Sequence, residues 1–273
     1  MKAYVSVDME GIGGIVEEIE TDPDKGGERY VQSRHRMTAE ANAAIEGCVK
    51  AGATDVLVAD SHWNFNNLIP EELHEAATLL RGKPRSHSMV HELDESFRAA
   101  LFVGYHAMAG TPRAILDHTF TGRIAAVTVN GVVVGETGIN AYLAGEFKVP
   151  VVLVTGDSSL IAEANALLPG VHTVAVKEAV SATAAKSLHP RRIHETIRSQ
   201  AEKAVKGADR IKPLVASRPV HMSVDFKGTS AADNAEIVPG VSRHGGTAIE
   251  FEADTFREAF RTFYAVVTIS GDA

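Results

Sequence analysis

The chain has 273 residues, of which 45% are hydrophobic and 23% charged, and its formal net charge is -8. A chain of this length and composition forms a substantial core without disulfides, so a largely disordered protein is excluded. The acidic balance and the dispersed lysines and arginines argue against nucleic acid as a partner. No apolar stretch is long enough to predict a membrane span.

The cysteine content and the amino terminus both bear on location. Cys48 is the only cysteine, so an intrachain disulfide cannot form. Residues 1–8 enter a strand-like run directly, without the basic and apolar segments of a secretion signal. We therefore expect a cytoplasmic protein.

Short runs rich in Val and Leu alternate with helical or loop-like segments through the first part of the chain. This alternation predicts an α/β fold, with a mostly parallel sheet flanked by helices. Residues 29–51 have a helical stripe of apolar residues and end at Gly52, as expected of the first crossover helix. The expected strands are 3–7, 55–59, 100–104, 125–129 and 151–155.

The sequence Asn130-Gly131 lies between two β-branched runs, which predicts a hairpin and therefore a mixed sheet. Helical segments are expected at 158–168 and 189–206, and a short strand at 173–176. Residues 207–219 are rich in turn signals. We accordingly predict a catalytic domain at 1–206 and a smaller C-terminal α/β domain at 219–273.

Acidic and imidazole side chains follow several of the expected strands. Asp8 and Glu10 come directly after the first strand, beside Gly11, and neighbouring buried carboxylates favour a cation between them. His62 follows the second strand and His106 the third. Ligands of open parallel sheets gather beyond the carboxyl ends of the strands, so these side chains are expected to converge. A mixed nitrogen and oxygen set suits zinc better than magnesium.

A further carboxylate, Glu136, follows the hairpin and is flanked by glycines at the start of an expected helix. By itself it could simply complement the helix dipole. In combination, Ser6-Val7-Asp8-Met9-Glu10-Gly11, Asp60-Ser61-His62, Gly104-Tyr105-His106-Ala107 and Gly135-Glu136-x-Gly138-x-Asn140 resemble the D-aminopeptidase family of bacterial binuclear zinc peptidases. The resemblance covers nearly the whole chain.

The resemblance implies roles that spacing alone does not give. It implies two zinc ions per subunit, bridged by Asp8, with Glu10 and His62 completing one ligand set and His106 and Glu136 the other. It also implies a catalytic histidine in the loop after the third strand, for which His118 is the candidate. The hypothesis that follows is aminopeptidase action on short peptides, in which a hydroxide that bridges the metals attacks the peptide and His118 transfers protons.

The resemblance further implies D-amino-acid specificity and a ring-like homo-oligomer that encloses its active sites. Three other interpretations remain open on the residues alone. The glycines after the first strand loosely match a nucleotide-binding fingerprint, although residues 21–27 separate them from the first helix. Binuclear metal sites also serve phosphoesterases. A single metal ion could instead stabilise a protein without enzymatic activity.

Overall fold

The computed structural model describes residues 1–270, in which the strands form a seven-stranded and a five-stranded sheet. Residues 271–273, the end of the expected C-terminal domain, lie outside the described part. The larger sheet has the order β3-β2-β1-β4-β7-β8-β9, and its described pairings are parallel except that of β8 with β9. Its strands are β1 (Lys2–Val7), β2 (Asp55–Asp60), β3 (Ala77–Leu80), β4 (Phe97–Val103), β7 (Val151–Asp157), β8 (His172–Ser181) and β9 (Ala184–Ser187).

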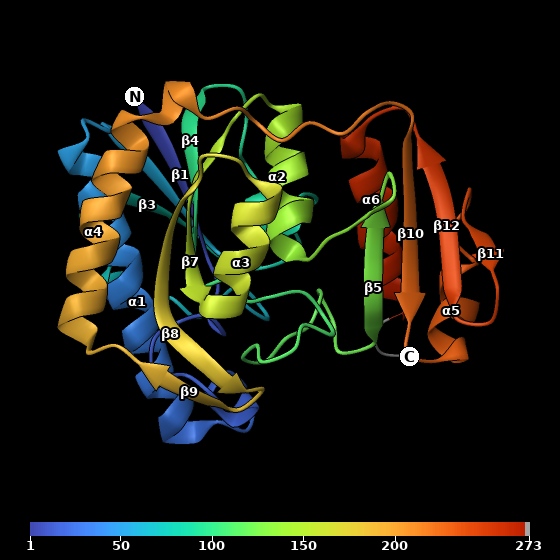
Figure 1. Cartoon of the computed structure of the whole chain (residues 1–273), viewed down its shortest axis with the longest axis horizontal. Helices are drawn as coiled ribbons and strands as arrows, with labels where there is room; N and C mark the ends of the chain where they lie inside the picture. The colour runs from blue at the N-terminus through green and yellow to red at the C-terminus, as the bar shows by residue number, and fades with distance from the viewer. Residues whose placement is uncertain (271–273) are drawn as a thin grey trace.

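Helices cover both faces of the larger sheet, as expected for near-continuous apolar strands. Figure 1 shows α1 (Gly27–Lys50) and α4 (Pro190–Lys206) on one face, with α2 (Glu136–Glu146) and α3 (Ser158–Leu167) on the other. Ala3, Val5 and Val7 of β1 point toward α1 and α4, whereas Tyr4 belongs to the core on the opposite face. The predicted mostly parallel, mixed α/β fold is confirmed.

The second sheet has the order β11-β12-β10-β5-β6 and lies beyond α2 (Figure 1). Its strands are β5 (Ile124–Val129), β6 (Val132–Val133), β10 (Val220–Phe226), β11 (Ser242–His244) and β12 (Ala248–Ala253), with the helices α5 (Thr229–Ala235) and α6 (Phe256–Ser270). The hairpin that contains 125–129 was expected to make the main sheet mixed, but it belongs to this second sheet, where β5 pairs antiparallel with β6 and β10. One apolar core continues from β4 through α2 to α6 and β10.

Four short 3-10 helices complete the described elements: η1 (Glu18–Glu20), η2 (Pro70–Glu72), η3 (Ser88–Val90) and η4 (Ala208–Arg210). Among residues 1–270, none of the helices combines the length and the apolarity needed to cross a bilayer. The chain order places β2 on one side of β1 and β4 on the other. The crevice at such a reversal of strand order is where ligands bind in open α/β sheets.

Candidate metal centre

Three adjacent strands end level with one another at this crevice. Val7 of β1 pairs with Asp60 of β2 and with Val103 of β4. The backbone ladder continues for one more residue, since Asp8 N donates to Val103 O and Ser61 N donates to Val7 O, both at 2.8 Å. The parallel register therefore brings the residues that follow these strands to one edge.

Glycines allow the loops after β1 and β4 to pack backbone against backbone. Gly11 N donates to Gly104 O at 2.8 Å, and a Cβ at position 11 would lie 1.8 Å from Tyr105 O. Gly104 has a φ of +70°, which favours glycine. The glycines of the first loop thus serve close packing, and η1 and a turn separate them from α1. They do not form the phosphate cradle that a nucleotide site requires.

Asp8 lies between two histidines, and each of its oxygens faces a different one. Asp8 Oδ1 is 3.3 Å from His62 Nδ1, and Asp8 Oδ2 is 3.5 Å from His106 Nε2. Glu10 Oε2 is 3.0 Å from the same His62 nitrogen. The carboxylate of Asp8 therefore connects a group containing His62 and Glu10 to a group containing His106.

Glu136, the first residue of α2, completes the second group. Its Oε1 is 3.4 Å from His106 Nε2 and 3.6 Å from His118 Nε2, and it accepts a hydrogen bond from Phe120 N at 2.7 Å. The rings of His106 and His118 are stacked, with centroids 4.0 Å apart. The structure thus brings together all six residues singled out from the sequence.

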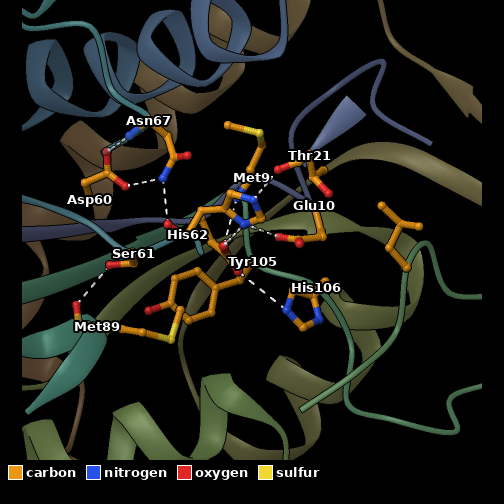
Figure 2. A network of polar contacts seen from close by, with 12 residues as sticks. Met9, Glu10, Thr21, Asp60, Ser61, His62, Asn67, Met89, Tyr105 and His106 are labelled. Atoms are coloured by element: carbon orange, nitrogen blue, oxygen red, sulfur yellow. Dashed lines mark hydrogen bonds and ion pairs between the residues drawn. The ribbon is translucent and has the colours of Figure 1, made fainter. Parts of the chain in front are cut away.

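Backbone carbonyls fix the orientation of all three imidazoles. His62 Nε2 is 2.8 Å from Thr21 O, His106 Nδ1 is 3.0 Å from Ala107 O, and His118 Nδ1 is 2.9 Å from Leu116 O. A carbonyl oxygen only accepts, so in each ring this nitrogen donates its proton. The other nitrogen is left to face the carboxylates, as Figure 2 shows for His62 beside Glu10. Metal-binding histidines have this arrangement.

Burial separates His118 from the other five side chains. The side chain of His118 is 27% exposed, whereas those of the other five are at most 8% exposed. Burial and the neighbouring His106 lower the pKa of His118, which keeps its imidazole neutral near pH 7. Its Nε2 is consequently a free base at the edge of the cluster.

The three buried carboxylates, those of Asp8, Glu10 and Glu136, require compensation by positive charge. Burial and the nearby Glu10 raise the pKa of Asp8. Burial lowers the pKa of His62, but the carboxylates of Glu10 and Asp8 raise it by more, so the net pKa of His62 is raised. Asp8 Oδ2, Glu10 Oε2 and His106 Nε2 are buried without hydrogen-bond partners. The lone pairs of these two carboxylates and one imidazole face one another. Such an arrangement fits a divalent cation that takes the place of the protons these groups would otherwise bind.

Two overlapping triplets have ligand atoms within 4.8 Å of one another: Asp8, Glu10 and His106, and His106, His118 and Glu136. This donor set of imidazoles and carboxylates suits zinc. His118 belongs to the second triplet, so the distances alone allow it to act as a ligand as well as a base.

Buried polar groups behind the cluster hold the loops that carry it. Asp60 accepts hydrogen bonds from Asn67 N and Leu68 N, and Asn67 Nδ2 donates to His62 O at 2.6 Å (Figure 2). Lys177 Nζ donates to the carbonyl of Glu10 at 2.5 Å and to two further carbonyls of the same loop. Asp60 was recognised only as part of the motif before His62, and Asn67 and Lys177 were not singled out from the sequence. Lys177 reaches the loop of Glu10 from β8 across 167 positions, so this contact exists only in the folded chain.

A cavity of about 820 Å³ opens over the cluster. Asp8, Glu10, His62, His118 and Glu136 form part of its lining. The lining also includes residues that the sequence did not single out, three of them from α6. Among these residues are Trp63, Phe65, Phe120, Tyr264, Val267 and Thr268.

A buried cluster of imidazoles and carboxylates at the carboxyl edge of a parallel sheet, below an open cavity, is the arrangement of a metal-dependent hydrolase. The comparisons with known proteins identify the kind of hydrolase: residues 1–265 match the D-aminopeptidase peptidase family, and the chain belongs to this family.

Two comparisons with individual proteins agree with this assignment. The chain is 39% identical to a D-aminopeptidase of Bacillus subtilis (strain 168) over 272 residues, which is 99% of this chain and 98% of the relative. It also matches a solved structure, the Zn-dependent D-aminopeptidase DppA from Bacillus subtilis, described as a self-compartmentalizing protease. That match has a TM-score of 0.96 and 38% identity, and it covers 100% of this chain and 99% of the other.

Proposed function

We propose that this protein is a zinc-dependent aminopeptidase that removes the N-terminal residue, of D configuration, from short peptides. One observation carries the proposal: three imidazoles, each fixed by a backbone carbonyl, direct their free nitrogens at three buried carboxylates. Membership of the D-aminopeptidase family supports both the reaction and the stereochemistry.

The ligand assignment is part of this proposal. Asp8, Glu10 and His62 hold one zinc ion, and Asp8, His106 and Glu136 hold a second, with Asp8 shared between them. The support is that Asp8 Oδ1 faces His62 while Asp8 Oδ2 faces His106. Bound zinc supplies a Lewis acid for the peptide carbonyl and lowers the pKa of a water molecule.

His118 is assigned to proton transfer. Its Nδ1 proton is held by Leu116 O, and its lowered pKa leaves Nε2 unprotonated and able to accept a proton from the attacking water. The same nitrogen then delivers that proton to the departing amine. The stacked ring of His106 limits its rotation, so Nε2 stays beside the cluster.

The test compares the wild type with His118→Ala, using D-Ala-D-Ala and L-Ala-L-Ala as substrates and measuring zinc content by atomic absorption. We expect cleavage of the D-peptide, two zinc ions per chain in both proteins, and a fall in kcat of about 10²- to 10⁴-fold in the variant. His194→Ala, on α4 and away from the cavity, serves as the control.

Each result separates one part of the proposal from another. Loss of a zinc ion from His118→Ala would make His118 a ligand, as the second triplet of donor atoms allows. Full activity would remove it from the reaction. One zinc ion per wild-type chain would contradict the bridging role of Asp8, and cleavage of the L-peptide alone would overturn the stereochemical assignment.

Assembly and location belong to the same proposal. The relative DppA is described as self-compartmentalizing, which supports a ring-like homo-oligomer for this chain as well. A monomer in light scattering would contradict it. The single, buried Cys48 supports a cytoplasmic location.

A further inference from the structure

The cavity above the metal centre is rich in acidic groups but has one basic side chain at its wall. Lys83 is the single lysine or arginine among the described residues that line it. Bound zinc offsets the charge of its proposed ligands Asp8, Glu10 and Glu136, so outside the metal centre Lys83 is the lining residue that attracts a peptide carboxylate. The acidic lining residues are Asp8, Glu10, Glu18, Asp117 and Glu136.

Lys83 is held in place without being neutralised. Its Nζ lies 4.7 Å from the centroid of the Phe65 ring, within the range of a cation–π contact. Among the ion pairs between residues 1–270 that the structure contains, none involves Lys83. The neighbouring Arg85 also lies over Phe65, but its guanidinium is committed to Asp60 O and Leu80 O. Lys83 therefore presents a free ammonium group.

The position of Lys83 relative to the metal centre follows from backbone contacts. Gly82 N donates to Phe65 O at 2.7 Å, and Phe65 N donates to His62 O at 2.8 Å. Lys83 is thus on the side of His62, whereas His118 is on the side of Glu136. Lys83 and His118 thus line the cavity next to different parts of the metal centre.

We propose that Lys83 binds the C-terminal carboxylate of a short peptide substrate. A dipeptide or tripeptide places this carboxylate about 3–7 Å beyond its first peptide bond, at about 3.5 Å per residue, so it must lie inside the same cavity. In a longer peptide, or in a C-terminal amide, no negative charge reaches Lys83. The inference rests on the proposed aminopeptidase function and assigns its substrates: di- and tripeptides with a free carboxyl end.

The test compares D-Ala-D-Ala with its C-terminal amide in the zinc-loaded enzyme. With the wild type we expect a KM about tenfold lower for the free acid, as a charged hydrogen bond would give. Lys83→Met, which retains the contact with Phe65, should raise the KM for the acid about tenfold and leave kcat and the KM for the amide unchanged. Lys83→Arg should restore the preference, and Lys227→Met, at an exposed position directly after β10, should not alter it.

Binding measurements separate this inference from the proposed function. A dipeptide analogue with a ketomethylene group in place of the peptide bond, as acid and as amide, is titrated calorimetrically into the same proteins. A preference for the acid that disappears in Lys83→Met supports the role of Lys83 even if no peptide is cleaved. Cleavage of peptides with an acid-to-amide ratio that is unchanged in Lys83→Met overturns that role and leaves the aminopeptidase function intact.

Discussion

Glu40 gives a quantitative prediction, because α1 carries its carboxyl group into the core behind the metal centre. Glu40 is 2% exposed, and its Oε1 accepts a hydrogen bond from Gly13 N at 2.7 Å, while Oε2 has no partner. Burial raises the pKa of Glu40 from its ordinary value of 4.5 to about 7. The folded protein thus resists ionisation of this carboxyl group more than the unfolded chain does.

The sign of the pH dependence follows from these two pKa values. Below pH 4.5 the group is protonated in both states and has no effect on stability. As the pH rises from 4.5 to about 7 the unfolded chain ionises first, so folding stability falls and stays reduced above that range. At about 1.4 kcal/mol per pKa unit, the difference between the two pKa values lowers the free energy of unfolding by at most about 3 kcal/mol.

Glu40→Gln tests this effect, since the amide oxygen still accepts from Gly13 N while the buried charge and its attraction to Lys177, which lowers the pKa of Glu40, are removed together. In urea unfolding of the metal-free proteins, we expect the variant to exceed the wild type by up to about 3 kcal/mol at pH 8 and to match it near pH 4. Glu195→Gln, on the exposed surface of α4, should show no such trend. A difference that does not change with pH, or a variant that is less stable at pH 8, would refute the reasoning.

Two further substitutions test how the backbone positions the metal ligands. Lys177→Met removes three hydrogen bonds to the loop of Glu10 and should lower the free energy of unfolding by about 2–4 kcal/mol. It should also weaken zinc binding, measured in competition with a chelator. Unchanged zinc affinity would show that the loop holds its shape without the ammonium group. Gly104→Ala would place a Cβ 2.3 Å from Asp8 O, so it should lower the free energy of unfolding by about 2–4 kcal/mol and weaken zinc binding. Gly245→Ala, where φ is also positive but the space is open, should lower the free energy of unfolding by only about 1 kcal/mol and leave zinc binding unchanged. Equal effects of the two substitutions would contradict a role for close packing at Gly104.

The strands of the metal centre could be predicted because their signals are local. Each expected strand of the larger sheet overlaps an observed strand, and Glu136 begins α2 as the glycines before it suggested. The polar residues after β1, β2 and β4 could also be recognised, because ligands follow the carboxyl ends of parallel strands. Their roles as zinc ligands stay predictions, as does the division into domains at 206 and 219.

Other features could not be predicted because their partners are distant in the sequence. The Asn130-Gly131 hairpin was recognisable, but its membership of the second sheet depends on pairing with β10, more than ninety positions further along the chain. Lys177 reaches the loop of Glu10 from β8, across 167 positions. Apolar periodicity shows that a segment is buried and not which segment covers it.

The sequence by itself determined the class of the fold, the chemistry of the donor groups and, through four motifs in order, the resemblance to one peptidase family. Only the tertiary structure decided how these groups act together: that the two oxygens of Asp8 face different histidines, that backbone carbonyls set the three imidazoles, and that Lys83 shares the cavity. Residue types are given by the sequence itself, and strand boundaries depend on neighbours along the chain. The direction of a lone pair depends on register and packing between strands far apart in it.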